Sequence, residues 1–165
     1  MARALIASLT LALSLVACGT AAQPASPAAE VQMAADLRGI EQIEVMFHKA
    51  GSQKDIELMM SLWTDNATFT TAGETFTGKD AIRTFFTTKS GPFQPQNTWI
   101  SETPAYKIRA TADGDKGTIY FECHYVDVAT KTVVSVVGAD GRVEKIDGKW
   151  LLTTLTASSL PELTP

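Results

Sequence analysis

One short segment of the chain gathers side chains that could exchange protons. Residues 120–126 have the sequence of a β-strand, and alternate residues of a strand point to opposite faces, so Tyr120, Glu122 and His124 share one face. Histidine titrates nearest to neutral pH, and a neighbouring carboxylate favours its charged form. If this face lines a cavity, His124 and Glu122 are the candidate catalytic acid–base pair. If it faces solvent or a second subunit, they are ordinary polar positions of a half-exposed strand.

Other kinds of chemistry find less support in the sequence. Cys123 lies on the opposite face of the same strand among apolar neighbours, which is typical of a core cysteine rather than a nucleophile. The two histidines, His48 and His124, have no second ligand at a metal-site spacing, so we expect no metal site. His48 follows the apolar helix position Phe47 and is expected to point outward. There is no glycine-rich phosphate or dinucleotide motif, so we also expect no cofactor.

The first residues have the organisation of an export signal. Arg3 precedes an apolar run at 4–15 that is too short to span a bilayer as a helix. The run ends in Leu15-Val16-Ala17-Cys18, which resembles the lipobox of bacterial lipoproteins, whose cysteine is acylated and becomes the first mature residue. The resemblance implies a lipoprotein precursor with a signal peptide at residues 1–17. It also implies a lipid anchor at Cys18 that holds the protein to a membrane of the cell envelope, facing the periplasm or the exterior. The alternative is an ordinary secretory signal with an incidental cysteine.

Composition divides the rest of the chain into a tether and one domain. Residues 18–29 are mostly small residues and prolines without apolar periodicity, which predicts a flexible tether, and residues 30–165 have the size and apolar content of one domain. The net charge is −4, and loss of Arg3 with a signal peptide would make it more negative, which disfavours nucleic acid as a partner. With Cys18 lipidated, Cys123 would have no cysteine left for an intramolecular disulfide.

The domain begins with helical patterns and continues with strand patterns. Apolar residues recur every three or four positions over 33–50, which predicts an amphipathic helix. Capping-box sequences at Ser52 and Thr77 predict two further helices, with a short β-hairpin between them. Alternating patterns then predict four long strands at 98–110, 117–128, 132–146 and 149–157. We expect the stretch Gly138-Ala139-Asp140-Gly141 to form a bulge or bend, or else a separate hairpin. We expect the whole to be an α+β fold with helices on one face of an antiparallel sheet.

Three short motifs support a more specific fold. They are Leu62-Trp63-Thr64-Asp65-Asn66-Ala67-Thr68-Phe69, Phe76-Thr77-Gly78-Lys79-Asp80-Ala81-Ile82 and Asp147-Gly148-Lys149-Trp150-Leu151-Leu152. In this order they resemble the SnoaL-like domains of the nuclear transport factor 2-like superfamily, which includes ketosteroid isomerases and scytalone dehydratases. The resemblance implies a cone in which three N-terminal helices pack on a curved antiparallel sheet. It also implies a small-molecule pocket lined by the first helix and the concave sheet face.

The resemblance does not extend to the family's catalytic groups. Aligned with ketosteroid isomerase, the chain has Phe47 in place of the oxyanion-stabilising tyrosine and Thr71 in place of the catalytic aspartate, and neither side chain can do the same work. The leading hypothesis is therefore that the cone binds a small apolar molecule without demonstrable catalysis. The candidate pocket residues are Phe47, Trp63, Phe69, Trp99 and Tyr120.

Two alternative functions stay open from the sequence. The first is a cofactor-independent lyase, isomerase or hydrolase that uses His124 and Glu122. The second is a protein-interaction module that forms a homodimer, because relatives often dimerise through the outer face of the sheet.

Overall fold

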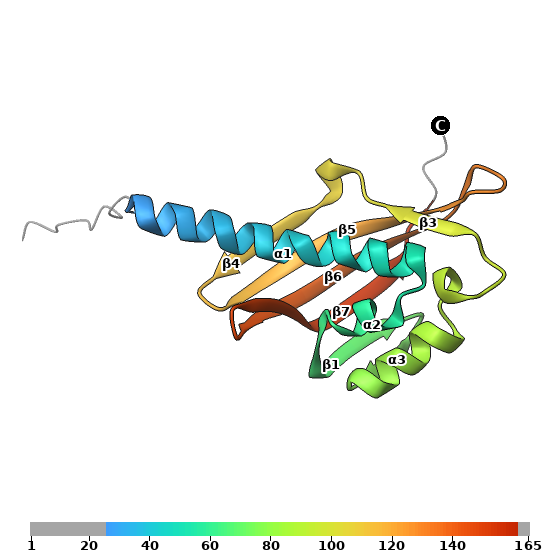
Figure 1. Cartoon of the computed structure of the whole chain (residues 1–165), viewed down its shortest axis with the longest axis horizontal. Helices are drawn as coiled ribbons and strands as arrows, with labels where there is room; N and C mark the ends of the chain where they lie inside the picture. The colour runs from blue at the N-terminus through green and yellow to red at the C-terminus, as the bar shows by residue number, and fades with distance from the viewer. Residues whose placement is uncertain (1–25, 162–165) are drawn as a thin grey trace, which may run out of the picture.

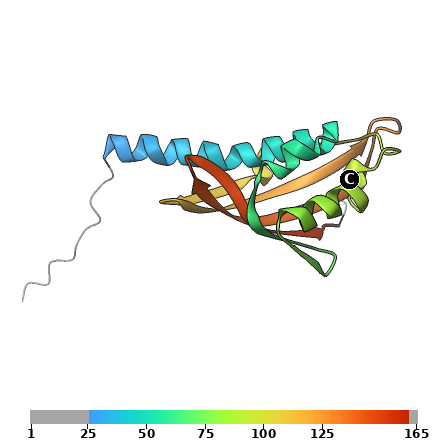
Figure 2. The same cartoon turned by 60° about the horizontal axis from the view of Figure 1, so that its bottom comes forward.

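The computed structural model describes residues 26–161 as three α-helices and a curved sheet (Figure 1). In chain order the elements are α1 (Pro27–Gln53), α2 (Ile56–Met60), β1 (Trp63–Thr71), β2 (Glu74–Thr77), α3 (Lys79–Thr88), the 3-10 turn η1 (Gly91–Phe93), β3 (Trp99–Glu102), the 3-10 turn η2 (Ala105–Lys107), β4 (Arg109–Asp113), β5 (Lys116–Asp127), β6 (Thr132–Ile146) and β7 (Lys149–Ser159). Figure 2 shows α1 running along one side of the sheet. The predicted α+β class is confirmed. The predicted signal peptide and Cys18 lie outside the described residues.

The sheet has the strand order β2-β1-β7-β6-β5-β3, with β4 also paired to β5. The other strand pairs are antiparallel, as predicted, but β1 runs parallel to β7, so the prediction of an antiparallel sheet was wrong for this pair. The predicted strand at 98–110 is divided into β3 and β4, because Pro104 has no backbone N–H to donate and η2 follows it. Both pieces pair with the same edge of β5, and within the described chain residues 121–123 of β5 have no strand beside them on that edge.

Helix α1 begins earlier than its apolar pattern predicts. The side chain of Ser26 accepts a hydrogen bond from the backbone of Ala29, and Pro27 occupies the first turn, where its missing N–H costs nothing. The last residues of the predicted tether therefore belong to the helix. The predicted cap at Ser52 was also wrong, because α1 continues past it and Asp55 caps α2 instead, accepting from Leu58 N at 2.9 Å.

A continuous apolar core joins α1 to the concave face of the sheet. Ile40, Ile43 and Phe47 of α1 are buried against this face, and the ring of Phe47 packs on Phe121 at a centroid distance of 5.3 Å. Asp36 links the first half of the helix to the sheet, because its carboxylate accepts hydrogen bonds from Lys145 Nζ at 2.7 Å and from Trp150 Nε1 at 3.3 Å.

Strand β6 runs unbroken through Gly138 and Gly141, so the predicted bulge was wrong. The register shifts lie elsewhere, between Tyr125 and Val126 of β5 and between Arg142 and Val143 of β6. A Cβ atom at Gly141 would lie 2.9 Å from a methyl group of Leu155 on the neighbouring strand. The glycine is therefore explained by close packing rather than by a bend in the strand.

Within residues 26–161, no helix combines the length and apolar character needed to cross a membrane.

Candidate functional site

A small cavity of about 190 Å³ lies between the concave face of the sheet and the helices that cover it. Aromatic rings of α1, β1 and α3 form much of its wall. Phe86 of α3 packs edge-on against Phe47 of α1 at 5.9 Å and stacks with Phe69 of β1 at 5.6 Å. The lining residues are Phe47, Phe69, Thr71, Phe85, Phe86, Lys89, Ser90, Gly91, Pro92, Trp99, Cys123, Tyr125, Ser135, Val137, Ala139, Leu155 and Ala157.

The structure places three of the five predicted pocket residues in this lining. Phe47, Phe69 and Trp99 contact the cavity. Trp63 is fully buried, but it packs behind Phe69 at a ring distance of 5.8 Å and is not part of the lining. Tyr120 lies on the opposite face of β5 and does not reach the cavity either. Alternation along β5 explains the difference, because only odd-numbered residues of this segment face α1.

Two polar side chains of β5, Cys123 and Tyr125, lie in the cavity wall. Burial raises the pKa of the Cys123 thiol to about 12, although polar contacts with Tyr125 and Ser101 oppose the rise. Burial also raises the pKa of the Tyr125 hydroxyl well above its ordinary value, and the neighbouring Cys123 adds to this effect. Both groups therefore keep their protons near neutral pH, and Cys123 is a poor nucleophile.

A buried polar cluster adjoins these two residues, and it contains His48, which was predicted from the sequence to point outward. His48 is buried at the gap between β3 and β4, so the expectation that it points outward was wrong. Its Nε2 atom lies 3.1 Å from a carboxylate oxygen of Glu44 and 2.5 Å from Thr103 Oγ1. Its Nδ1 atom contacts the hydroxyl of Ser101 on β3. This group of four residues, Glu44, His48, Ser101 and Thr103, is called the His48 cluster below.

A sequence signal for the His48 cluster exists. Ile40, Glu44, His48 and Ser52 are each four positions apart, and this spacing places them in one row along a helix. Ile40 is completely buried, so the polar members of its row were candidates for the interior. Ser52 completes the row by accepting a hydrogen bond from the backbone N–H of Ser101 at 3.0 Å.

The predicted catalytic pair, Glu122 and His124, lies on the other side of β5. Glu122 accepts hydrogen bonds at 3.0 Å from Lys107 Nζ, from Tyr120 Oη and from His124 Nε2. Burial pushes the pKa of Glu122 upward, but hydrogen bonds from His124, Lys107 and Tyr120 outweigh burial, so the net shift is downward. The same pairing raises the pKa of Lys107. Neither Glu122 nor His124 lines the cavity, so this pair cannot act on a molecule bound there.

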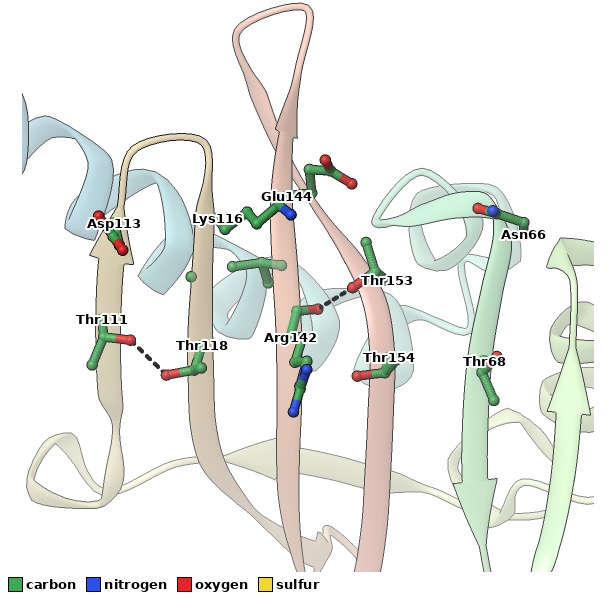
Figure 3. Close-up of a pocket in the computed structure, with 12 residues that line it drawn as sticks. Asn66, Thr68, Thr111, Asp113, Lys116, Thr118, Arg142, Glu144, Thr153 and Thr154 are labelled. Atoms are coloured by element: carbon green, nitrogen blue, oxygen red, sulfur yellow. Dashed lines mark hydrogen bonds between the residues drawn. The ribbon is translucent and has the colours of Figure 1, made fainter.

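The outer face of the sheet has a wider, polar groove of about 680 Å³ (Figure 3). One row of side chains crosses it from β4 to β1, because Thr111, Thr118, Arg142, Thr154 and Thr68 are successive cross-strand neighbours. Further lining residues are Asn66, Asp113, Lys116, Gly117, Val143, Glu144 and Thr153. The groove has hydroxyls and charges of both signs but no aromatic side chain, so it differs chemically from the cone cavity.

Among the described residues, no group of three or more His, Cys, Asp or Glu side chains is arranged to hold a metal ion.

Comparison with known proteins identifies the family. The profile of the SnoaL-like domain matches residues 33–152, and the chain therefore belongs to the SnoaL-like domain family. A comparison with curated proteins finds no match.

Solved structures share the fold at low sequence identity. An NTF2-like protein with a cystatin-like fold from Novosphingobium aromaticivorans has a TM-score of 0.71 and 15% identity, and the match covers 82% of this chain and 88% of the other. A putative dehydratase from Streptomyces avermitilis has a TM-score of 0.64 and 14% identity, covering 77% and 97%. The hexachlorocyclohexane dehydrochlorinase LinA-type3 from Novosphingobium barchaimii has a TM-score of 0.64 and 16% identity, covering 82% and 99%. The chain thus has an NTF2-like, cystatin-like α+β fold with a curved sheet.

Proposed function

We propose that the protein binds a small, mainly apolar molecule in the cone, and that a lipid on Cys18 holds it at the cell envelope. The observation that carries the first part is the cavity of about 190 Å³, whose wall is mainly aromatic and aliphatic with a minority of polar residues. Ligand sites are typically concave, mostly apolar and furnished with a small number of polar groups that orient the ligand.

The size of the cavity limits what it can hold. A cavity of about 150 Å³ in another protein takes up benzene, so the cone suits a single six-membered ring with one small substituent. Phe86 and Phe69 offer ring faces and edges on one side, and Trp99 closes another. Drug-sized ligand sites are larger, at about 300–1,000 Å³, so a steroid-sized ligand is not expected.

The binding part is tested with a ring-sized probe. Toluene is titrated into protein carrying Cys18→Ser, which removes the acylation site. Native mass spectrometry gives the number of toluene molecules bound, and changes in amide NMR chemical shifts give the affinity and the location. Saturable binding of one toluene, with shifts centred on Phe86 and Trp99, is expected. Failure of toluene and other single-ring hydrocarbons to bind up to their solubility limits would refute the binding part.

The anchoring part rests on the motif that ends at Cys18. Two or more acyl chains hold a protein stably to a membrane, whereas a single chain binds only marginally. Cells expressing the full chain are fed an alkyne-tagged fatty acid, and incorporation into the protein is followed. Label is expected in the natural protein and in a Cys123→Ser control, and it is expected to disappear with Cys18→Ser. Label that persists with Cys18→Ser would contradict the anchor.

Catalysis is not part of this proposal. Two of the structural relatives are described as a putative dehydratase and a dehydrochlorinase, but identities of 14% and 16% carry over the fold alone. The acid–base pair suggested by the sequence, Glu122 and His124, lies outside the cavity.

The outer groove supports a second candidate function, a homodimer. Arg142, Lys116, Asp113 and Glu144 lie together in it, and none of them forms an ion pair with another described residue. Under a twofold axis the same mixed charges would meet in complementary pairs. Light scattering after size-exclusion chromatography should then give a dimer that Arg142→Glu dissociates and that Arg38→Glu, on the exposed surface of α1, leaves intact. A monomeric natural protein would remove this candidate.

A further inference from the structure

One wall of the cone is formed by residues 90–99, which lead from α3 to β3 beside the end of α1 (Figure 1). Gly91, Pro92 and Trp99 of this 90–99 segment line the cavity. We propose that Lys54 is a positioning residue for the ligand, because its ammonium group fastens this wall to α1, and that the affinity of the cone depends on a cation at this point. The inference rests on the proposed binding function.

The ammonium group of Lys54 is surrounded by backbone carbonyl groups of the 90–99 segment. Its Nζ atom lies 2.8 Å from each of three carbonyl oxygens, which belong to Pro92, Gln94 and Asn97. A lysine ammonium group has three N–H donors and no acceptor, so these contacts use all of its donors. Lys54 forms no ion pair with another described residue. The three carbonyls, called the carbonyl cradle below, therefore hold the cation without a carboxylate.

The backbone at the end of α1 directs Lys54 to the carbonyl cradle. Lys54 has the left-handed conformation, with φ 57° and ψ 30°, and its N–H group donates to carbonyls of the last helical turn. Glycine is the usual residue in this conformation at a helix end, because a side chain disfavours it. A lysine here is therefore better explained by the contacts of its side chain than by its backbone preference.

Short contacts join the carbonyl cradle to the cavity wall. The Asn97 side chain donates to the Gly91 carbonyl at 2.8 Å. The Trp99 ring lies against Gly91, where a Cβ atom would be 2.4 Å from a ring carbon. Pro92 belongs to both parts, because its carbonyl accepts from Lys54 and the residue lines the cavity. The wall and the cradle therefore form one packed unit.

Loss of the ammonium group should loosen this wall without unfolding the domain. The hydrogen bonds from Lys54 to Gln94 and Asn97 are exposed, so water can replace the ammonium group at these carbonyls. The wall is then closed for only part of the time, and the apparent affinity falls by the same fraction. A lysine that only stabilised the fold would leave the affinity of the folded protein unchanged.

Chemical rescue tests the carbonyl cradle. Toluene affinity is measured by amide NMR titration of the full chain carrying Cys18→Ser. Lys54→Ala should weaken binding at least about tenfold, the effect of one lost hydrogen bond to a charged group. Propylammonium has the atoms that this substitution removes, so excess propylammonium chloride should restore the affinity, whereas tetramethylammonium chloride, which has no N–H donor, should not. Lys54→Met fills the same space without a donor and should resist rescue. Lys49→Ala, on the exposed surface of α1, is the matched control and should bind toluene normally.

The unsubstituted lysine gives a second measurement in the same full chain. Acylation by acetic anhydride is followed at each lysine by mass spectrometry. Lys54 should react more slowly than the exposed Lys49, because its hydrogen bonds to the carbonyl cradle must break first. Toluene at about ten times its dissociation constant should slow the reaction of Lys54 about a further tenfold, since it binds the closed wall, and should leave Lys49 unchanged.

The outcomes separate this inference from the proposed function. If toluene does not bind the cone with Lys54 intact, both proposals fail. If toluene binds that cone and Lys54→Ala equally well, or if propylammonium restores no more affinity than tetramethylammonium, the inference is overturned and the apolar cone stands. If Lys54→Ala does not fold, acylation decides. Slowing of the Lys54 reaction by toluene supports the inference, and a rate that toluene does not change overturns it.

Discussion

The substitution Ala139→Leu tests whether the cavity inside the cone can accept additional side-chain atoms and whether filling it prevents ligand binding. Ala139 lies on β6, is 2% exposed and lines the cavity. Leucine adds three carbon atoms, which at about 0.8 kcal/mol each would gain about 2.4 kcal/mol of burial if the cavity accepts them without strain. Ordering the longer side chain costs about 0.5–1 kcal/mol, so the variant should be more stable by about 1.5 kcal/mol. A cavity of about 190 Å³ then has too little room for a ring, and toluene affinity should fall at least about tenfold.

Urea unfolding followed by circular dichroism gives the stability, and NMR titration gives the affinity. Ala35→Leu is the matched control, because Ala35 is exposed on α1 and the same change there should alter the free energy of unfolding by no more than about 0.5 kcal/mol. If Ala139→Leu destabilised the fold by more than about 1 kcal/mol while toluene bound as before, the account of the cavity would be wrong, since overpacking has that cost in a filled core.

Three further predictions concern the fold. Gly117→Ala should destabilise the protein by about 1–3 kcal/mol in urea unfolding, because the new Cβ would lie 2.4 Å from the Thr111 carbonyl oxygen; an unchanged midpoint would contradict that packing. Hydrogen bonds from Lys145 and then from Gln32 lower the pKa of Asp36 below 3.8, so their stabilisation is present above that pH and is lost as the pH falls through the lowered pKa. The melting temperature should therefore drop more steeply in acid than that of Asp36→Asn, and parallel curves would refute the pairing. In protein carrying Cys18→Ser, native Cys123, with a pKa of about 12 instead of 9.0, should react with a disulfide reagent roughly a thousandfold more slowly than after unfolding. Rapid labelling of the native state would show an accessible thiolate.

Much of the fold could be predicted from local pattern because the relevant interactions are local. The apolar spacing of α1 and the alternation along β5 and β6 identify the long elements. The ends of elements depend on weaker signals. Pro104 divides a predicted strand, and a cap at Ser26 extends a predicted helix. The parallel pairing of β1 with β7 joins distant parts of the chain, and no local pattern encodes it.

The site was harder to predict because its location depends on which face of β5 lines the cone and on which side of α1 is buried. The alternation along β5 correctly separated Glu122 and His124 from Cys123, but nothing local says which face lines the cone. The structure assigns that face to Cys123 and its neighbours. His48 was misplaced because a histidine next to a core phenylalanine usually points outward, whereas here the gap between β3 and β4 leaves room for a buried polar cluster.

A crystal structure of the protein with bromobenzene would show most directly whether the cone holds a ring-sized apolar molecule. The anomalous signal of bromine locates the probe without reference to any assumed pose. One bromine site is expected inside the cone, between Phe86 and Tyr125, with the aromatic wall otherwise unchanged. A cone closed by its own side chains, with bromine only in the outer groove or nowhere on the protein, would contradict that expectation.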